Sequence, residues 1–321
     1  MLKTAFLYDP VFLKHQTGWA HPEKRQRLTA LLKHLKETGL WESLRHIQPR
    51  PASIEAITAI HTACYVDQIR LASSTGKLFK PDEVTLGSPG TYEAALMAAG
   101  AVLTALDAVM LHQVQNAFCA VRPPGHHAMP DRAMGFCFFN NVAIGARYLQ
   151  HRYGLRRIAI IDWDIHHGNG TQNVFYNDPS VFYASLHQDS LYPPDSGHAS
   201  ETGEGAGKGF TLNVPMPADA TDADYQQSFA RVIIPAVAGF QPEFILISAG
   251  FDGHRDDKLA AATLTEQGFA RLTQMTMELA DVCCMGRLVS VLEGGYSLSG
   301  LTASVEAHLR VLMGQKVLEQ E

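Results

Sequence analysis

Long apolar runs, an excess of basic charge and an even set of cysteines are all missing from this sequence of 321 residues. No stretch approaches the ~18 uninterrupted apolar residues of a membrane-spanning helix. The first ten residues, MLKTAFLYDP, contain too short an apolar run for a secretory signal. Lys and Arg number 26 against 32 Asp and Glu, a formal net charge of −6, which argues against a nucleic-acid surface or a polybasic membrane anchor. We therefore expect a cytoplasmic protein that binds neither nucleic acid nor membrane.

The cysteines are few and odd in number, and none of their spacings is that of a zinc ribbon or a redox pair. A chain of this length buries roughly three quarters of its unfolded surface, so its core needs no disulfide. Nothing in the sequence indicates the oligomeric state. We expect free thiols in a reducing compartment at all five positions, Cys64, Cys119, Cys137, Cys283 and Cys284.

Short β-rich apolar runs alternate with longer helical patterns along the chain. The residues between 187 and 208 are rich in Pro and Gly and predict a long ordered loop. The alternation predicts an α/β protein with one domain over residues 1–321, in which a single doubly wound, mostly parallel sheet carries helices on both faces. The predicted strands are 2–8, 117–121, 157–161, 181–186, 210–214, 244–248 and 288–292, and the predicted helices are 22–36, 92–111, 140–153, 222–238, 266–281 and 301–313.

Four polar motifs begin where predicted strands stop. RPPGHHA follows 117–121, DWDIHHGNG follows 157–161, SAGFDGH follows the strand that starts at Phe244, and LEGGY ends the strand that starts at Leu288. In an open parallel sheet, ligands bind outside the carboxyl ends of the strands. We therefore expect these four motifs to meet at one edge of the sheet.

The motif DWDIHHGNG has the composition of a metal site. Asp162, Asp164 and His166 alternate with apolar residues, so that in extended geometry their side chains share one side. Asp252 of SAGFDGH is the natural third ligand beside Asp164 and His166, which leaves a position open for water, as in a catalytic zinc site. Iron(II) would fit nearly as well. The simpler interpretation is a solvated loop that caps a helix starting near Gly168.

Adjacent imidazoles and a tyrosine supply groups for acid–base work. His126 and His127 titrate near neutral pH and can take or give a proton, and Asp162 and Asn169 are candidate partners that would set their tautomers. A charged partner favours the imidazolium and a neutral one the free base. Tyr296 can donate a hydrogen bond to a polarised carbonyl oxygen. Taken singly, each is more commonly an ordinary loop or packing residue.

Aromatic residues could wall a channel to this site. Phe136, next to Gly135 in GFCFFNN, could form one wall, and Tyr192 in the long loop could form the other. Two aromatic faces would hold an aliphatic chain and exclude water.

The ordered motifs, from HPEKRQRL to EGGY, resemble the zinc-dependent histone deacetylase family, which shares its fold with arginase. The family includes bacterial deacetylase-like and acetylpolyamine amidohydrolases. Asn169, where class I members carry Asp, together with DWD and SAGFD makes the chain similar to the class II branch. The resemblance implies zinc-assisted hydrolysis that removes acetyl or related acyl groups from lysine side-chain amines. It assigns Asp164, His166 and Asp252 to zinc, and His127 to general base and acid catalysis.

The resemblance implies further roles. His126 would be the second catalytic His, paired with Asp162, Asn169 would be the partner of His127, and Tyr296 would polarise the acyl carbonyl. It implies a substrate tunnel lined by Gly135, Phe136, Tyr192 and Leu259, and a structural potassium ion held by backbone oxygens of Asp162, Asp164, His166 and Leu186 with the Ser185 hydroxyl.

Some alternatives remain open. Gly168 and His254 stand where arginase-like enzymes carry Asp for a second metal, which favours a one-metal site. Acetylpolyamine amidohydrolases of one branch carry Glu at the position of Leu259, yet Asp256 and Asp257 nearby could also meet a cationic substrate. A non-catalytic module that recognises acyl groups would lack a ligand or the Tyr, and all of these are present.

Overall fold

The computed structural model describes residues 3–317, which fold around one eight-stranded sheet with every strand pair parallel. The strand order is β2-β1-β3-β8-β7-β4-β5-β6. The predicted doubly wound parallel sheet is therefore confirmed. The strands are β1 (Ala5–Leu7), β2 (Arg45–Ile47), β3 (Asn116–Cys119), β4 (Ile158–Asp162), β5 (Val181–Gln188), β6 (Thr211–Met216), β7 (Phe244–Ala249) and β8 (Leu288–Leu292).

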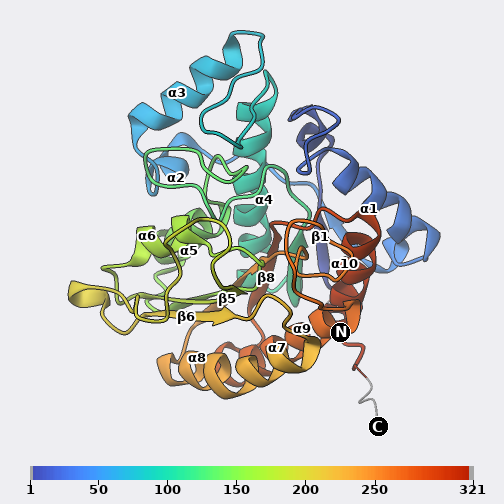
Figure 1. Cartoon of the computed structure of the whole chain (residues 1–321), viewed down its shortest axis with the longest axis vertical. Helices are drawn as coiled ribbons and strands as arrows, with labels where there is room; N and C mark the ends of the chain where they lie inside the picture. Colours follow the sequence, from blue (N-terminus) through green and yellow to red (C-terminus); the bar gives the residue numbers. More distant parts are fainter. Residues whose placement is uncertain (1–2, 318–321) are drawn as a thin grey trace.

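Helices cover both faces of this sheet (Figure 1). On one side lie α4 and α5, and on the other lie α7, α8, α9 and α10, with α1 packed against α10. The helices are α1 (Gln26–Glu37), α2 (Ile54–Thr58), α3 (Ala63–Ser74), α4 (Thr91–Met110), α5 (Asn141–Tyr153), α6 (Asn169–Phe175), α7 (Asp222–Ser228), α8 (Ile234–Phe240), α9 (Glu266–Cys284) and α10 (Leu298–Leu312).

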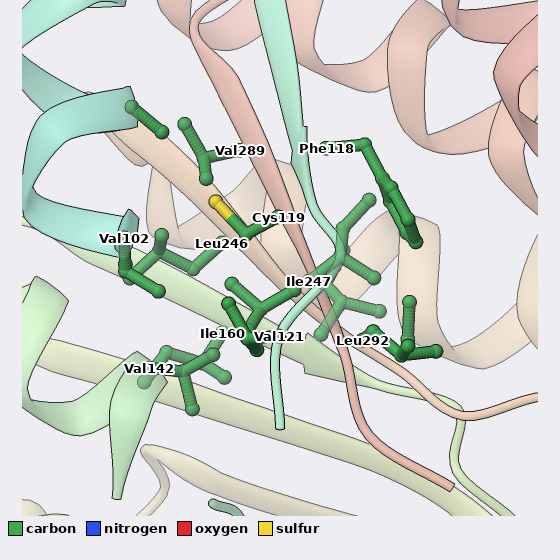
Figure 2. Close-up of a cluster of buried hydrophobic side chains, with 14 of the residues drawn as sticks. Val102, Phe118, Cys119, Val121, Val142, Ile160, Leu246, Ile247, Val289 and Leu292 are labelled. Atoms are coloured by element: carbon green, nitrogen blue, oxygen red, sulfur yellow. The ribbon is translucent and has the colours of Figure 1, made fainter. Parts of the chain in front are cut away.

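The central strands are buried on both faces, which explains their continuous apolar sequence. In Figure 2, Val102 of α4 lies beside Leu246 of β7, and Val142 of α5 lies beside Ile160 of β4. Gly145 of α5 allows this close approach, since a Cβ there would lie 2.9 Å from a methyl carbon of Val102. All five cysteines are free, as expected.

The helix α4 is long and apolar enough to cross a membrane by length and composition alone. Glu93 and Asp107 interrupt its apolar sequence, so it is not the uninterrupted run of ~18 apolar residues whose absence was expected. In addition, 67% of its most apolar window is buried inside the fold, where α4 packs on β3 and α5. Its apolar composition is that of a helix in the middle of a protein core.

Several elements differ from the sequence prediction. The helix expected at 222–238 is divided by a π-helical turn at Phe229–Ile233, because Pro235 lacks the N–H that would continue the α-helical pattern. The short elements β2 and α2 and the 12-residue helix α3 were not predicted. Leu2, at the start of the first predicted strand, lies outside the described residues.

Candidate active site

The four motifs meet because the strands that carry them are neighbours. β3, β8, β7 and β4 are adjacent in the sheet, and all point the same way. Their carboxyl ends therefore lie side by side, although the motifs span most of the chain. The sheet order, rather than the local sequence, brings these side chains together.

One imidazole and two carboxylates form the centre of the site. His166 Nδ1 lies 3.0 Å from Asp164 Oδ1 and 3.1 Å from Asp252 Oδ2. The candidate ligand atoms of the three residues all lie within 4.8 Å of one another. Both carboxylates are fully buried, and the imidazole is 8% exposed.

Backbone N–H groups hold the far oxygen of each carboxylate. Gly294 N donates to Asp164 Oδ2 at 2.8 Å, and Ile165 N donates to Asp252 Oδ1 at 3.1 Å. The near oxygens are thereby directed toward the ring of His166. Gly294 permits this arrangement, since a Cβ there would lie 2.0 Å from Asp252 Oδ2 and 2.6 Å from Asp164 Oδ2.

This cluster has the properties of a site for a divalent cation. Asp252 Oδ2 is buried and has no hydrogen-bond partner. Burial and the charge of Asp164 raise the pKa of Asp252, because two buried carboxylates repel one another. Burial favours neutral His166, but Asp164 and Asp252 outweigh it and raise the pKa of the ring to about 10. The pocket therefore favours positive charge at the point where the three side chains meet, and oxygen and nitrogen ligands suit zinc or iron(II).

The two adjacent histidines have different partners. His126 Nδ1 lies 3.1 Å from Asp162 Oδ2, and His127 Nδ1 lies 2.8 Å from the side-chain oxygen of Asn169. Burial favours neutral His126, but Asp164 and Asp162 outweigh it and raise its pKa to about 10. Burial and the neighbouring His126 hold the pKa of His127 well below its usual range. The structure thus pairs a charged ring with a neutral one.

The orientation of Asn169 determines which His127 nitrogen is free. Asn169 Nδ2 lies 3.4 Å from the sulfur atoms of both Met129 and Met134, so its carbonyl oxygen faces His127. That oxygen accepts the Nδ1 proton of His127, which leaves Nε2 unprotonated. A neutral His in this tautomer can accept a proton.

Tyr296 follows two glycines at the end of β8, and its ring packs between two other side chains. The ring centroid lies 5.8 Å from that of Phe136, and the guanidinium carbon of Arg27 lies 5.1 Å from it. Arg27 also donates to the carbonyl oxygens of Gly295 and Glu293, at 2.6 and 2.5 Å. Burial and the charge of Asp252 raise the pKa of Tyr296 well above its usual value, so the phenol keeps its proton.

These groups open into one largely apolar cavity of about 220 Å³. The four predicted tunnel residues all line it. Val84 and Leu191 also line it. Neither was predicted as a cavity residue, because both lie in loops without a recognisable motif. The lining residues are Val84, His127, Gly135, Phe136, His166, Leu191, Tyr192, Leu259 and Tyr296.

Gly135 and Phe136 form a sharp turn at the cavity wall. Both have positive φ, +55° and +69°, and the N–H of Phe136 donates to Thr85 Oγ1 at 3.0 Å. A Cβ at Gly135 would lie 2.4 Å from a ring carbon of His127 and 2.8 Å from one of Tyr192. Glycine at this position therefore leaves room for both rings.

Comparison with known proteins agrees with this geometry. Residues 21–312 match the histone deacetylase domain. The chain belongs to this family. A probable deacetylase of Archaeoglobus fulgidus is 42% identical over 299 residues, which cover 92% of this chain and 82% of the relative. A histone deacetylase-like amidohydrolase of Pseudomonas aeruginosa is 39% identical over 316 residues, with the same coverage.

The fold of this histone deacetylase family member agrees with that of a solved relative. The crystal structure of the HDA15 HD domain superposes with a TM-score of 0.93 at 36% identity, and the match covers 98% of this chain and 90% of that one. The chain therefore belongs to the histone deacetylase family by sequence and shares its fold.

A buried glutamate of the EGGY motif was also missed as a site residue. Glu293 Oε2 accepts the N–H groups of Gly125 and His126 at 2.6 and 3.2 Å, and Oε1 accepts the hydroxyl of Ser248 at 3.2 Å. Burial raises its pKa to about 7 despite the charge of His126. Glu293 thus ties the loop that carries both histidines to the end of β8. A single Glu beside two glycines and a tyrosine has no sequence pattern that predicts a buried hydrogen-bonding role.

Three of the five residues expected to bind potassium lie next to one another in the sheet, and Asp164 and His166 follow the end of β4. The pairing of β4 with β5 places Asp162 opposite Ser185, beside Leu186. The Ser185 hydroxyl lies 2.8 Å from His187 Nδ1. Occupation of this place by potassium stays a prediction.

Proposed function

We propose that this protein is a zinc-dependent deacetylase that removes acetyl groups from lysine side-chain amines. One observation carries the proposal: His166, His127 and Tyr296 line the same apolar cavity. A candidate metal ligand, a proton acceptor and a hydrogen-bond donor can therefore all reach one bound amide. The apolar wall formed by Phe136 and Leu259 suits the aliphatic part of a lysine side chain.

Asp164, His166 and Asp252 would hold the zinc. When bound, the ion supplies polarisation of the acyl carbonyl and lowers the pKa of water at the site. His127, neutral and with Nε2 free, accepts a proton from the attacking water and then returns it to the departing amine. The Tyr296 hydroxyl donates a hydrogen bond to the acyl oxygen as negative charge develops there. His126 contacts Asp162 and lies beside His127, with the two ring centroids 4.0 Å apart, and so borders the site.

Metal removal and the substitution Tyr296→Phe test this proposal together. Protein stripped by a chelator should lose hydrolysis of an acetyl-lysine peptide and regain it with zinc. We expect Tyr296→Phe to stay folded and zinc-loaded, with kcat lower by about 10²–10³, the usual cost of one lost oxyanion donor. Tyr153→Phe, which removes a phenol bonded to Asp107 far from the cavity, is the control.

Three results would contradict parts of the proposal. Hydrolysis that does not depend on the metal would remove the zinc from the reaction, and absence of hydrolysis after zinc is restored would favour a non-catalytic acyl-binding protein. Unchanged turnover of Tyr296→Phe would remove the phenol from the mechanism. Restoration with iron(II) in a parallel sample tests the other metal that the ligands suit.

The alternative substrate is an acetylated polyamine. Leu259 lines the cavity where a carboxylate would be needed to meet a second ammonium group, and both oxygens of Asp257 are engaged by backbone N–H groups. These contacts favour lysine. Rates on an acetyl-lysine peptide and on acetylputrescine separate the two, and a strong preference for acetylputrescine would support the alternative. A cytoplasmic location stays part of the proposal.

A further inference from the structure

One carboxylate joins the two loops that carry Tyr296 and Leu259. Asp257 lies in the loop after β7 and is 7% exposed. Its Oδ2 accepts the N–H groups of Tyr296 at 2.6 Å and Ser297 at 2.8 Å, and its Oδ1 accepts the N–H of Leu259 at 3.1 Å. A single side chain therefore ties the candidate oxyanion donor to a second residue that lines the cavity.

The chemistry of these contacts requires a carboxylate. Its three partners are all N–H donors, and an ionised carboxyl group offers only acceptor atoms. An amide of the same shape has one oxygen, so its NH₂ group would have to face either Leu259 N–H or the pair of N–H groups at residues 296 and 297. Ser297 is the N-cap of α10, where negative charge is also favoured by the helix dipole.

The backbone before Tyr296 has little stiffness of its own. Gly294 and Gly295 precede it, and Gly295 has a φ of +122°, a conformation that glycine adopts readily. Arg27 holds the carbonyl oxygen of Gly295 on one side. On the other side, the two hydrogen bonds to Asp257 hold the N–H groups of Tyr296 and Ser297, so the carboxylate completes the restraint.

We propose that Asp257 is a positioning residue for Tyr296. It fixes the backbone from which the phenol reaches the acyl oxygen, and it joins that backbone to Leu259, which also lines the cavity. This role rests on the proposed function, because it acts through the hydrogen bond that Tyr296 donates. It also leaves Asp257 without a free oxygen for a cationic substrate.

Kinetics in two backgrounds test this role. We expect Asp257→Asn to lower kcat by about 10–100-fold, the cost of displacing a catalytic group by ~1 Å, with the zinc content unchanged. In a Tyr296→Phe background the same substitution should lower kcat by less than about twofold, because the group it positions is already gone. If Asp257→Asn only destabilised the fold, it would lower kcat in both backgrounds.

Asp222→Asn is the matched control. Asp222 accepts the N–H of Thr265 at 2.9 Å and its hydroxyl at 2.6 Å, and so ties a helix to a loop as Asp257 does, but it does not line the cavity. We expect it to change stability and leave kcat within about twofold of the original. Should Asp257→Asn not fold, Asp257→Glu keeps the acceptors and moves them by one methylene, and the same two-background comparison applies.

A second readout does not depend on turnover. We expect amide hydrogen exchange in residues 293–297 to be about tenfold faster or more in Asp257→Asn, while exchange in the later turns of α10, from residue 302 on, stays unchanged. If exchange in the segment around Tyr296 were unchanged in Asp257→Asn, the inference would be overturned, even if the protein hydrolysed no substrate. Equal losses of kcat in both backgrounds, or a kcat unaffected by Asp257→Asn, would also overturn it. If the unaltered protein showed no metal-dependent hydrolysis, that result would instead contradict the proposed function.

Discussion

The substitution Gly294→Ala should weaken metal binding without disturbing the backbone. Gly294 is not among the glycines with positive φ, so alanine can adopt its backbone conformation. Alanine also keeps the backbone N–H that donates to Asp164 Oδ2 in the wild-type protein. The added methyl group, however, would lie 2.0 Å from Asp252 Oδ2 and 2.6 Å from Asp164 Oδ2. The effect is therefore steric and falls on the two candidate carboxylate ligands.

The size of the effect follows from these distances. Ordinary contact begins near 3.4 Å, so Asp252 Oδ2 must retreat by about 1.4 Å. Metal sites tolerate ligand displacements of only ~0.2 Å. We expect the zinc affinity to fall by at least ~10–100-fold, as for disruption of groups that orient ligands. At a fixed zinc concentration, the stabilisation of the fold by zinc should then fall by about 1.4–2.8 kcal/mol.

Competition with a chelator measures the zinc affinity, and denaturant unfolding with and without zinc measures the stabilisation. Gly239→Ala is the matched control, since Gly239 is helical, its φ is not positive, and a Cβ there would meet no heavy atom within 4 Å. Wild-type zinc affinity in Gly294→Ala would show that the ligands do not meet beside Gly294. The assignment of Asp164 and Asp252 to the metal would then fail.

Two further predictions concern the cavity wall and the buried histidines. The variant Gly135→Ala should retain zinc, but its kcat/KM should be lower by about tenfold or more, because the added Cβ would displace the rings of His127 and Tyr192. Full activity on an acetyl-lysine peptide would contradict this cavity shape. Burial lowers the pKa of His308 to about 3, whereas a histidine in the unfolded chain has a pKa near 6.5. Between these pH values the unfolded state binds a proton that the folded state does not. The free energy of unfolding should therefore fall as the pH drops below 6.5. In denaturant unfolding, His308→Gln should reduce this slope by up to ~1.4 kcal/mol per pH unit, and an unchanged slope would show that His308 does not contribute.

Local sequence patterns determined much of the architecture. Continuous apolar runs predicted β4, β7 and β8 to within a residue or two, because strands buried on both faces leave no position for polar side chains. Gly154 correctly marked the end of α5, where it adopts the left-handed conformation that favours glycine. The short strand β2 escaped prediction, since three half-exposed residues carry no periodic signal.

The sequence by itself also determined which chemical groups stand at the strand ends, since residue type and spacing limit what a cluster such as Asp162 to His166 can bind. Only the tertiary structure decided that β8 and β7 lie between β3 and β4, which brings the motifs together. It alone assigned Val84 to the cavity and Asp257 to the backbone of Tyr296. Strand order and loop contacts depend on interactions between residues far apart in the chain, and no local pattern records those.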